Sequence, residues 1–329
     1  MEESKRDYLF DNLKVLLIFL VVFGHSLENY IDNNMVLRSI YFFIFMFHMP
    51  LFIYISGYFS KNIDKCRKNA SKDLLMPFIF FNIIWYVSIG KLDRPIYYAG
   101  WTLWYLLSLF LWRFFLKDII KIKWVLGVSI LAGLVIGFID SYNFLLIFSR
   151  TFTFLPFFLL GYYSNSLVIN KVKNYSKVIS TLGLLCMGLV AFLITKYGLI
   201  DYRFLYLSHS YRSFGFGMVQ GILMRAMFYI LAILISIFII NLICSKKLNL
   251  SKIGRNTLII YLGHIYIIRG INKSMPTINS TIAILCISLA FSISICGILS
   301  LPILLNIYKY VFRKINYCIN TVLVKLDIQ

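Results

Sequence analysis

The sequence has little charge, and most of that charge is of one sign. Only 14% of its 329 residues are charged, and Lys and Arg outnumber Asp and Glu by 33 to 13. A water-soluble protein of this size would have roughly a quarter charged residues. No polar stretch is long enough to fold around a core of its own, so the sequence excludes a separate soluble domain.

The sequence also lacks the cysteine spacings of a metal site or a disulfide framework. Its six Cys residues are isolated, and four of them lie in or at the ends of apolar runs. We interpret them as packing residues and expect no metal. In a soluble protein the excess of basic residues would suggest a nucleic-acid partner; here membrane topology accounts for it, and we expect no such partner.

Long apolar runs predict an all-α membrane helix bundle of about ten transmembrane helices. The runs are about 18 to 28 residues long, as a bilayer requires of a helix, whereas barrel strands would alternate apolar with polar residues. We expect one integral-membrane domain over residues 1–329, and no cleavable signal peptide, because no small-residue cleavage site follows the first run. The predicted spans are 9–30, 37–60, 74–90, 101–116, 124–140, 144–163, 178–198, 217–244, 256–270 and 281–308.

The distribution of basic residues predicts the orientation of the bundle. With the N-terminus inside, 21 of the 33 Lys and Arg residues fall in inner segments and seven in outer segments or at outer span ends. Cytoplasmic loops of membrane proteins carry such an excess. We therefore expect both termini in the cytoplasm and a multi-pass protein of the cell membrane.

The first span carries a polar stripe. Lys14 and His25 are eleven positions apart, which on a helix is about three turns plus 20° and about 16 Å along the axis. Glu28 follows on the same face, within reach to orient the imidazole. Because charge in hydrocarbon is costly, we expect this face to line an internal cavity. The alternative, a His25 that only hydrogen-bonds a neighbouring helix, remains open.

The loop 61–72 is the most basic inner segment of the sequence. Arg67, Lys68 and Lys72 would face the compartment that holds anionic nucleotides and coenzymes. Topogenic charge explains the same residues without any ligand.

Polar residues also lie elsewhere in and between the spans. His48 comes just before Pro50, which removes a backbone donor and loosens the second helix; a locally satisfied His explains it equally well. Arg150 begins the sixth span at its outer end, as an interfacial anchor or a ligand contact. The outer loop 199–216 mixes aromatic and polar residues that suit a sugar or a solvated loop, including Tyr206, His209 and Arg212.

Five blocks of sequence occur in order on the predicted helices. They are Asp11–Lys14 with Phe23–His25, Phe47–Leu51 with Ser56–Tyr58, Leu103–Leu107, Phe154–Tyr163, and Ile253–Leu258 with Tyr261 and His264. Together these blocks resemble the acyltransferase family 3 membrane proteins, most closely the fucose 4-O-acetyltransferase-like enzymes of cell-surface polysaccharides. The resemblance covers nearly the whole chain.

The resemblance implies ten core helices and transfer of an acyl group, usually acetyl from acetyl-CoA, to a sugar hydroxyl. The basic residue and the His of the family's first helix fall on Lys14 and His25, which implies that His25 is catalytic. The family's Arg pair before the third helix is missing from residues 70–73. The nearest basic residues there are Arg67, Lys68 and Lys72.

We therefore predict a membrane O-acetyltransferase, of a bacterial plasma membrane, that uses cytosolic acetyl-CoA and a surface polysaccharide or its lipid-linked precursor. Lys14 and the basic loop would hold the phosphates of the donor. His25, oriented by Glu28, would act as general base or accept the acetyl group in passing, and Arg150 would stabilise the oxyanion or contact the acceptor. The alternative is a polysaccharide or lipid-linked sugar transporter, although we find no repeat between the two halves.

Overall fold

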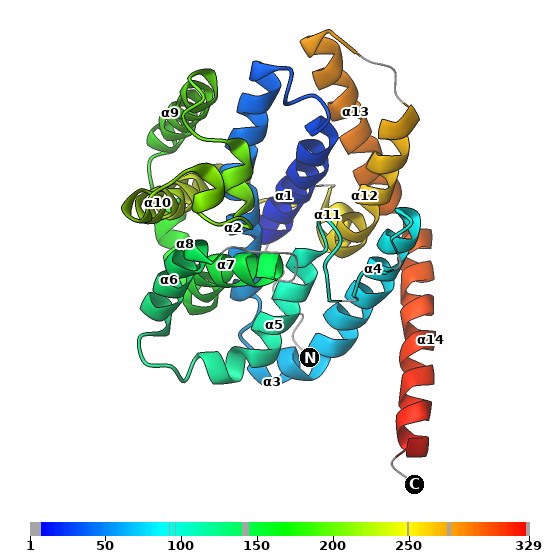
Figure 1. Ribbon diagram of the computed structural model, residues 1–329. Helices are drawn as coiled ribbons and strands as arrows, with labels where there is room; N and C mark the ends of the chain where they lie inside the picture. Colours follow the sequence, from blue (N-terminus) through cyan, green and yellow to red (C-terminus); the bar gives the residue numbers. More distant parts are fainter. Residues whose placement is uncertain are drawn as a thin grey trace.

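The computed structural model describes residues 8–91, 93–95, 97–139, 145–248, 250–274 and 278–326, and all regular structure within these ranges is helical. Figure 1 shows the arrangement of the helices. The α-helices are α1 (Tyr8–Leu27), α2 (Met35–Tyr58), α3 (Ile63–Ala70), α4 (Met76–Ser88), α5 (Trp104–Ile119), α6 (Val125–Val135), α7 (Leu145–Tyr163), α8 (Ser166–Lys173), α9 (Lys177–Lys196), α10 (Met218–Leu242), α11 (Ser251–Arg255), α12 (Thr257–Ser274), α13 (Thr281–Leu299) and α14 (Pro302–Leu326). A π-helical turn, η1 (Ser71–Leu75), joins α3 to α4, and short 3-10 turns are η2 (Ile136–Phe138), η3 (Tyr202–Tyr206) and η4 (Arg212–Phe214).

Six helical segments of the described chain are long and apolar enough to cross a membrane. They are Tyr8–Leu27, Met35–Tyr58, Ile63–Ser88, Lys177–Lys196, Met218–Leu242 and Thr281–Leu299. A seventh is obtained if Ile147–Tyr163 and Ser166–Lys173, which meet at 96°, count as one broken span. The chain is thus an all-helical membrane protein. Each of the ten predicted spans contains a helix, and ten crossings remain a prediction.

The structure corrects the sequence-based boundaries at two places. The predicted span 281–308 is divided, because α13 ends at Leu299 and α14 begins at Pro302. Proline fits the first helical position but disfavours the helical conformation of the residue before it. The basic segment 61–72 is mostly helical and not a loop: the Asn62 side chain caps α3 by accepting a hydrogen bond from the backbone N of Lys65 at 3.0 Å.

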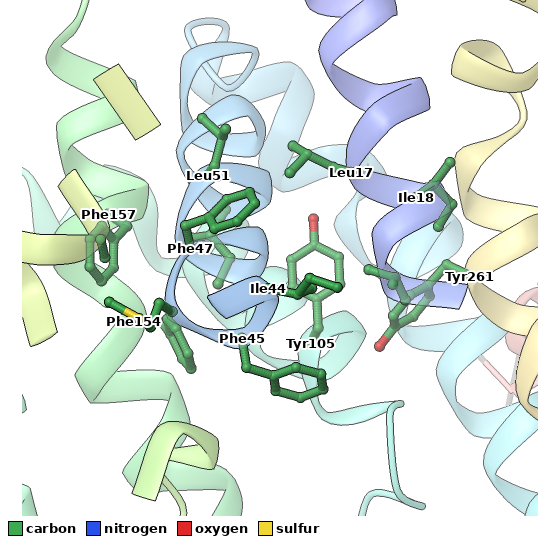
Figure 2. Packing of buried hydrophobic residues seen from close by; sticks show 14 of the residues in the cluster. Leu17, Ile18, Ile44, Phe45, Phe47, Leu51, Tyr105, Phe154, Phe157 and Tyr261 are labelled. Atoms are coloured by element: carbon green, nitrogen blue, oxygen red, sulfur yellow. The ribbon is translucent and has the colours of Figure 1, made fainter. Parts of the chain in front are cut away.

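Helix α1 lies in the middle of the bundle (Figure 1). In the most apolar 18-residue stretch of α1, 67% of the residues are buried, whereas 22% are buried in the corresponding stretch of α9 at the periphery. Helix α1 packs against α2, α11, α12 and α13. Figure 2 shows Leu17 and Ile18 of α1 in the apolar core that α1 shares with α2, α5, α7 and α12. Polar groups on α1 therefore face protein, whereas α9 presents exposed Leu182, Leu185 and Leu189 as a lipid-facing surface would.

Helices α2 and α7 cross at close range. A Cβ added to Gly57 would overlap the carbonyl oxygen of Phe158, and one added to Gly161 would overlap the carbonyl oxygen of Tyr54. Small residues allow membrane helices to approach until their backbones touch. This crossing fixes α2, which carries part of the candidate site, against α7, which carries another part.

Candidate functional site

His25 and Glu28 form a hydrogen-bonded pair near the end of α1. Nδ1 of His25 lies 2.7 Å from Oε1 of Glu28, and the two side chains are only 11% and 14% exposed. Because a carboxylate only accepts hydrogen bonds, the Nδ1 of His25 carries the proton. In the neutral ring, Nε2 then keeps its lone pair and can accept a proton from a substrate. The contact that the three-residue spacing predicts is therefore present.

A chain of hydroxyl groups supports Glu28 from the other side. The Tyr41 hydroxyl donates to Oε1 of Glu28 at 3.2 Å, and it lies 2.9 Å from the hydroxyl of Tyr206. Since the Tyr41 proton goes to the carboxylate, the Tyr206 hydroxyl donates to Tyr41. Both tyrosines thus stabilise the ionised carboxylate and hold the outer-loop turn η3 against the helix pair.

The imidazole of His25 opens into a cavity of about 490 Å³. This outer cavity is bordered by α1, α2, α4, α5, α7 and α12, by Lys91 and Arg94, and by the segments 98–102 and 205–209. The sequence-predicted residues that line it are His25, Glu28, His48, Arg150, Tyr206 and His209. Six side chains from four separate parts of the sequence are therefore brought to one place.

His25 and His48 line the outer cavity, and His264 lies behind them in contact with His25. The ring of His264 lies 5.4 Å from that of His25, between centroids, and Phe45 stacks edge-on between His25 and His48 at 6.0 Å and 4.6 Å. Nδ1 of His48 bonds to the carbonyl of Ile44 at 2.9 Å. His48 therefore has a hydrogen bond within its own helix, which is the alternative to a role in ligand binding. It also lines the outer cavity.

Arg150 also lines the outer cavity, from α7. Its Nε donates to the carbonyl oxygen of Tyr206 at 2.9 Å, and its guanidinium lies 5.1 Å from the centroid of the Trp104 ring. Two of its side-chain contacts are thus with protein groups that fix its direction. A fixed cation that lines the same cavity as His25 can stabilise negative charge that develops there.

A second cavity, called the inner cavity, has a volume of about 220 Å³ and shares the lining residue Tyr261 with the outer cavity. Lys14 and Arg113 supply its positive charge, and most of its remaining lining is apolar. Tyr261 lines both cavities. Its hydroxyl donates to the carbonyl oxygen of Thr102, and its ring lies 5.4 Å from that of Tyr105. Figure 2 shows Tyr105 and Tyr261 beside α1 and α2, and both rings line the inner cavity.

Four residues with a predicted binding role line neither of these two cavities. Arg67 lies 3.4 Å from Oδ2 of Asp118 and over the ring of Phe114. Lys68 and Lys72 are exposed on the helical segment α3–η1, and Arg212 is exposed on η4. Their roles in binding stay predictions.

The structure adds residues for which we predicted no role. Arg113, near the end of α5, lines the inner cavity together with Lys14. His264, within the last motif block, is fully buried, and its Nε2 has no hydrogen-bond partner within the described chain. Tyr41 and Trp101 reach His25 or Glu28 only through the tertiary fold. Their aromatic character was the only signal, and aromatic residues are frequent in this sequence.

The outer loop has its own electrostatics. Burial and the hydrogen bond to Asp32 raise the pKa of Tyr202 to about 12. Partial burial, together with the positive charges of Arg150 and Arg203, lowers the pKa of His209 below its usual value. His209 is therefore neutral at pH 7, and it borders the cavity as a hydrogen-bonding group without adding charge.

Comparison with known proteins identifies the class of this protein. Residues 7–301 match the model of an acyltransferase domain family, acyltransferase 3, so the chain belongs to that family. It is a membrane acyltransferase, and the family favours an enzyme over the transporter that the sequence alone left open.

The match to individual relatives is weaker than the match to the family. The chain is 25% identical over 295 residues to the nodulation protein NolL of Sinorhizobium fredii, which covers 79% of this chain and 77% of that protein. A 92-residue match to the nodulation protein NolL of Mesorhizobium japonicum is 39% identical and covers 25% of each chain. No solved structure matches the chain.

Proposed function

We propose that this protein transfers an acetyl group from acetyl-CoA to a hydroxyl of a surface polysaccharide or its lipid-linked precursor. The observation that carries the proposal is the hydrogen-bonded His25–Glu28 pair, which lines a cavity large enough for a sugar. Membership of the acyltransferase family supports acyl transfer. Beyond acyl transfer, the proposal specifies acetyl as the acyl group, coenzyme A as its carrier and a saccharide as the acceptor.

His25 acts as the general base. Its Nε2 takes the proton from the acceptor hydroxyl as the hydroxyl oxygen attacks the thioester carbonyl, and the imidazolium that forms is stabilised by Glu28. Arg150 faces the negative charge that develops on the carbonyl oxygen. When the tetrahedral intermediate collapses, the carbon–sulfur bond breaks and His25 returns the proton to the thiolate. The products are an O-acetyl ester and free coenzyme A, and His25 is neutral again.

The inner cavity receives the donor in this proposal. Lys14 and Arg113 meet the phosphate groups of coenzyme A, because cations hold phosphate by charge-assisted hydrogen bonds. The apolar part of the inner cavity takes the pantetheine arm, and the thioester passes Tyr261 to reach His25. On the orientation that the basic residues predict, both termini and the inner cavity are on the cytoplasmic side, where acetyl-CoA is made.

The test measures two products in membranes that contain the protein. Free thiol released from acetyl-CoA reports consumption of the donor, and ester-linked acetate on purified polysaccharide reports the acceptor. We expect His25→Ala, at equal expression, to lose both by about 100- to 10,000-fold, the usual contribution of a general base. Retained acetylation in this variant would refute the proposed role of His25.

Lys14 tests the donor side separately. Replacing Lys14 with Gln should raise the KM for acetyl-CoA about 3- to 30-fold, because one charge-assisted hydrogen bond to a phosphate is lost. Lys65→Gln is the matched control, since Lys65 is exposed on α3 and lines neither cavity. Equal KM values for the two variants would remove Lys14 from the donor site.

A further inference from the structure

Basic side chains gather in and near the lining of the outer cavity. Lys91, Arg94 and Arg150 line it, and the guanidinium of Arg269 lies 5.0 Å from the ring centroid of Trp85, which also lines it. Among the described residues of the lining, Glu28 alone has a carboxylate. That carboxylate already accepts hydrogen bonds within the protein, so the cavity presents a net positive surface to a ligand.

Membrane topology does not explain these cations. It places basic residues on the cytoplasmic side, and the outer cavity lies on the opposite side in the proposed orientation. Seven basic residues of the whole sequence belong to outer segments or outer span ends, and Lys91, Arg94 and Arg269 are three of them. Nearly half of the outer positive charge is thus collected around one cavity.

Pairing within the protein does not explain them either. Across the described ranges, no ion pair joins Lys91, Arg94, Arg150 or Arg269 to a carboxylate. Asp93 lies between Lys91 and Arg94 in the sequence but forms no ion pair with either. The guanidinium groups of Arg94 and Arg269 lie over aromatic rings, 6.0 Å from the centroid of Tyr98 and 5.0 Å from that of Trp85. Guanidinium groups held over aromatic rings keep their donor edges available for a carboxylate or a phosphate.

Aromatic rings in the same wall suit the rest of a sugar. Trp101 is 38% exposed, and its ring centroid lies 5.5 Å from that of His25. Trp85 and Trp104 line the same cavity. The apolar face of a sugar ring packs well on an indole. A sugar packed on Trp101 would present a hydroxyl to His25 and its substituents to the surrounding cations.

We propose that the acceptor is an anionic saccharide, with a carboxylate or a phosphate next to the hydroxyl that becomes acylated. The inference rests on the proposed function and specifies its acceptor. Lys91 and Arg94 bind the anionic group within the outer cavity. The selection of the acceptor is thus separate from the chemistry, because His25 and Glu28 perform the transfer on any sugar that reaches them.

The first experiment identifies the charge of the natural product. Membranes from cells that make the native polymer are incubated with acetyl-labelled acetyl-CoA, and the labelled polymer is cleaved to its repeat units at neutral pH and separated by anion exchange. We expect the label in charged fragments. Phosphatase shifts their elution if the charge is a phosphate, and carbodiimide reduction shifts it if the charge is a carboxylate. Label in neutral fragments would overturn the proposal.

The second experiment connects that charge to the two cations. The double variant K91Q/R94Q should transfer acetyl to the native polymer roughly 3- to 10-fold more slowly at limiting polymer, as expected for two exposed ionic contacts. Its rate should also depend less on salt than the wild-type rate, because salt screens exposed charges. Lys196→Gln is the matched control, an exposed cation of the same predicted side that does not line the cavity.

The outcomes separate the two proposals. A double variant with the wild-type rate and salt dependence would refute the anionic acceptor and leave the acetyltransferase intact. Transfer that survives His25→Ala would refute the acetyltransferase mechanism, whatever the charge of the product.

Discussion

Replacing Glu28 with Gln tests whether the carboxylate supports the chemistry of His25 or only its position. The amide oxygen of Gln still accepts a hydrogen bond from Nδ1, which lies 2.7 Å from the carboxylate in the native protein. What is lost is the negative charge that stabilises the imidazolium. A hydrogen bond to a charged group is worth about 1.5–3 kcal/mol and one to a neutral group about 0.5–1.5 kcal/mol, so the loss of about 1–1.5 kcal/mol should lower kcat about 5- to 13-fold. The KM for acetyl-CoA should not change, because Glu28 does not line the inner cavity.

The assay is initial-rate acetyl transfer with the two single variants and the double variant H25A/E28Q. If Glu28 acts through His25, the double variant should be no slower than His25→Ala, because the charge has no imidazolium left to stabilise. Tyr41→Phe is the control, since it removes one hydrogen bond to Glu28 of 3.2 Å and keeps the charge; its loss should stay within about threefold. Additive losses in the double variant, or an unchanged kcat in E28Q, would refute the role of Glu28.

Two further predictions concern stability. Gly161→Leu should lower the Tm in detergent by several degrees or prevent folding, because its side chain overlaps the α2 backbone, whereas Gly188→Leu, with open space around its Cβ position, should keep the wild-type Tm. His209, whose pKa is lowered by burial and by Arg150 and Arg203, favours the neutral ring when folded. The stability that the neutral ring of His209 contributes is complete above pH 6.5 and is lost as the pH falls, because the unfolded chain then binds the proton more readily. The Tm difference between wild type and His209→Gln should therefore shrink between pH 7.5 and pH 5. A constant difference would contradict this.

The positions of the helices follow from apolar periodicity and length, and their exact limits depend on local chemistry. The predicted span 281–308 ran through Pro302 because hydropathy stays high across the break. The proline itself was the signal, since it starts a helix more readily than it continues one. The charged helix α3 was missed because it is too polar to appear as an apolar run.

The candidate site was predictable only in its local part. The His25–Glu28 contact follows from a spacing of three on one helix, which fixes the distance before any tertiary structure is known. Tyr41 and His264 reach the pair from α2 and α12, and no spacing within the sequence relates them to His25. Lys91, Arg94 and Arg269 were visible in the sequence as exceptions to the positive-inside rule. Only the fold shows that Lys91 and Arg94 line one cavity and that Arg269 lies over Trp85 in its lining.

The polar stripe of Lys14, His25 and Glu28 is tolerated because α1, the helix that carries it, lies inside the bundle. A titratable group within a membrane protein is tolerated when it faces protein or water, and α1 is the most buried of the candidate spans. The stripe also crosses most of the bundle, so Lys14 reaches one cavity and His25 the other, with Tyr261 at the wall of both. A peripheral helix such as α9 would present the same residues to lipid. One central helix can therefore meet a charged donor at one end and activate an acceptor at the other without exposing either group to hydrocarbon.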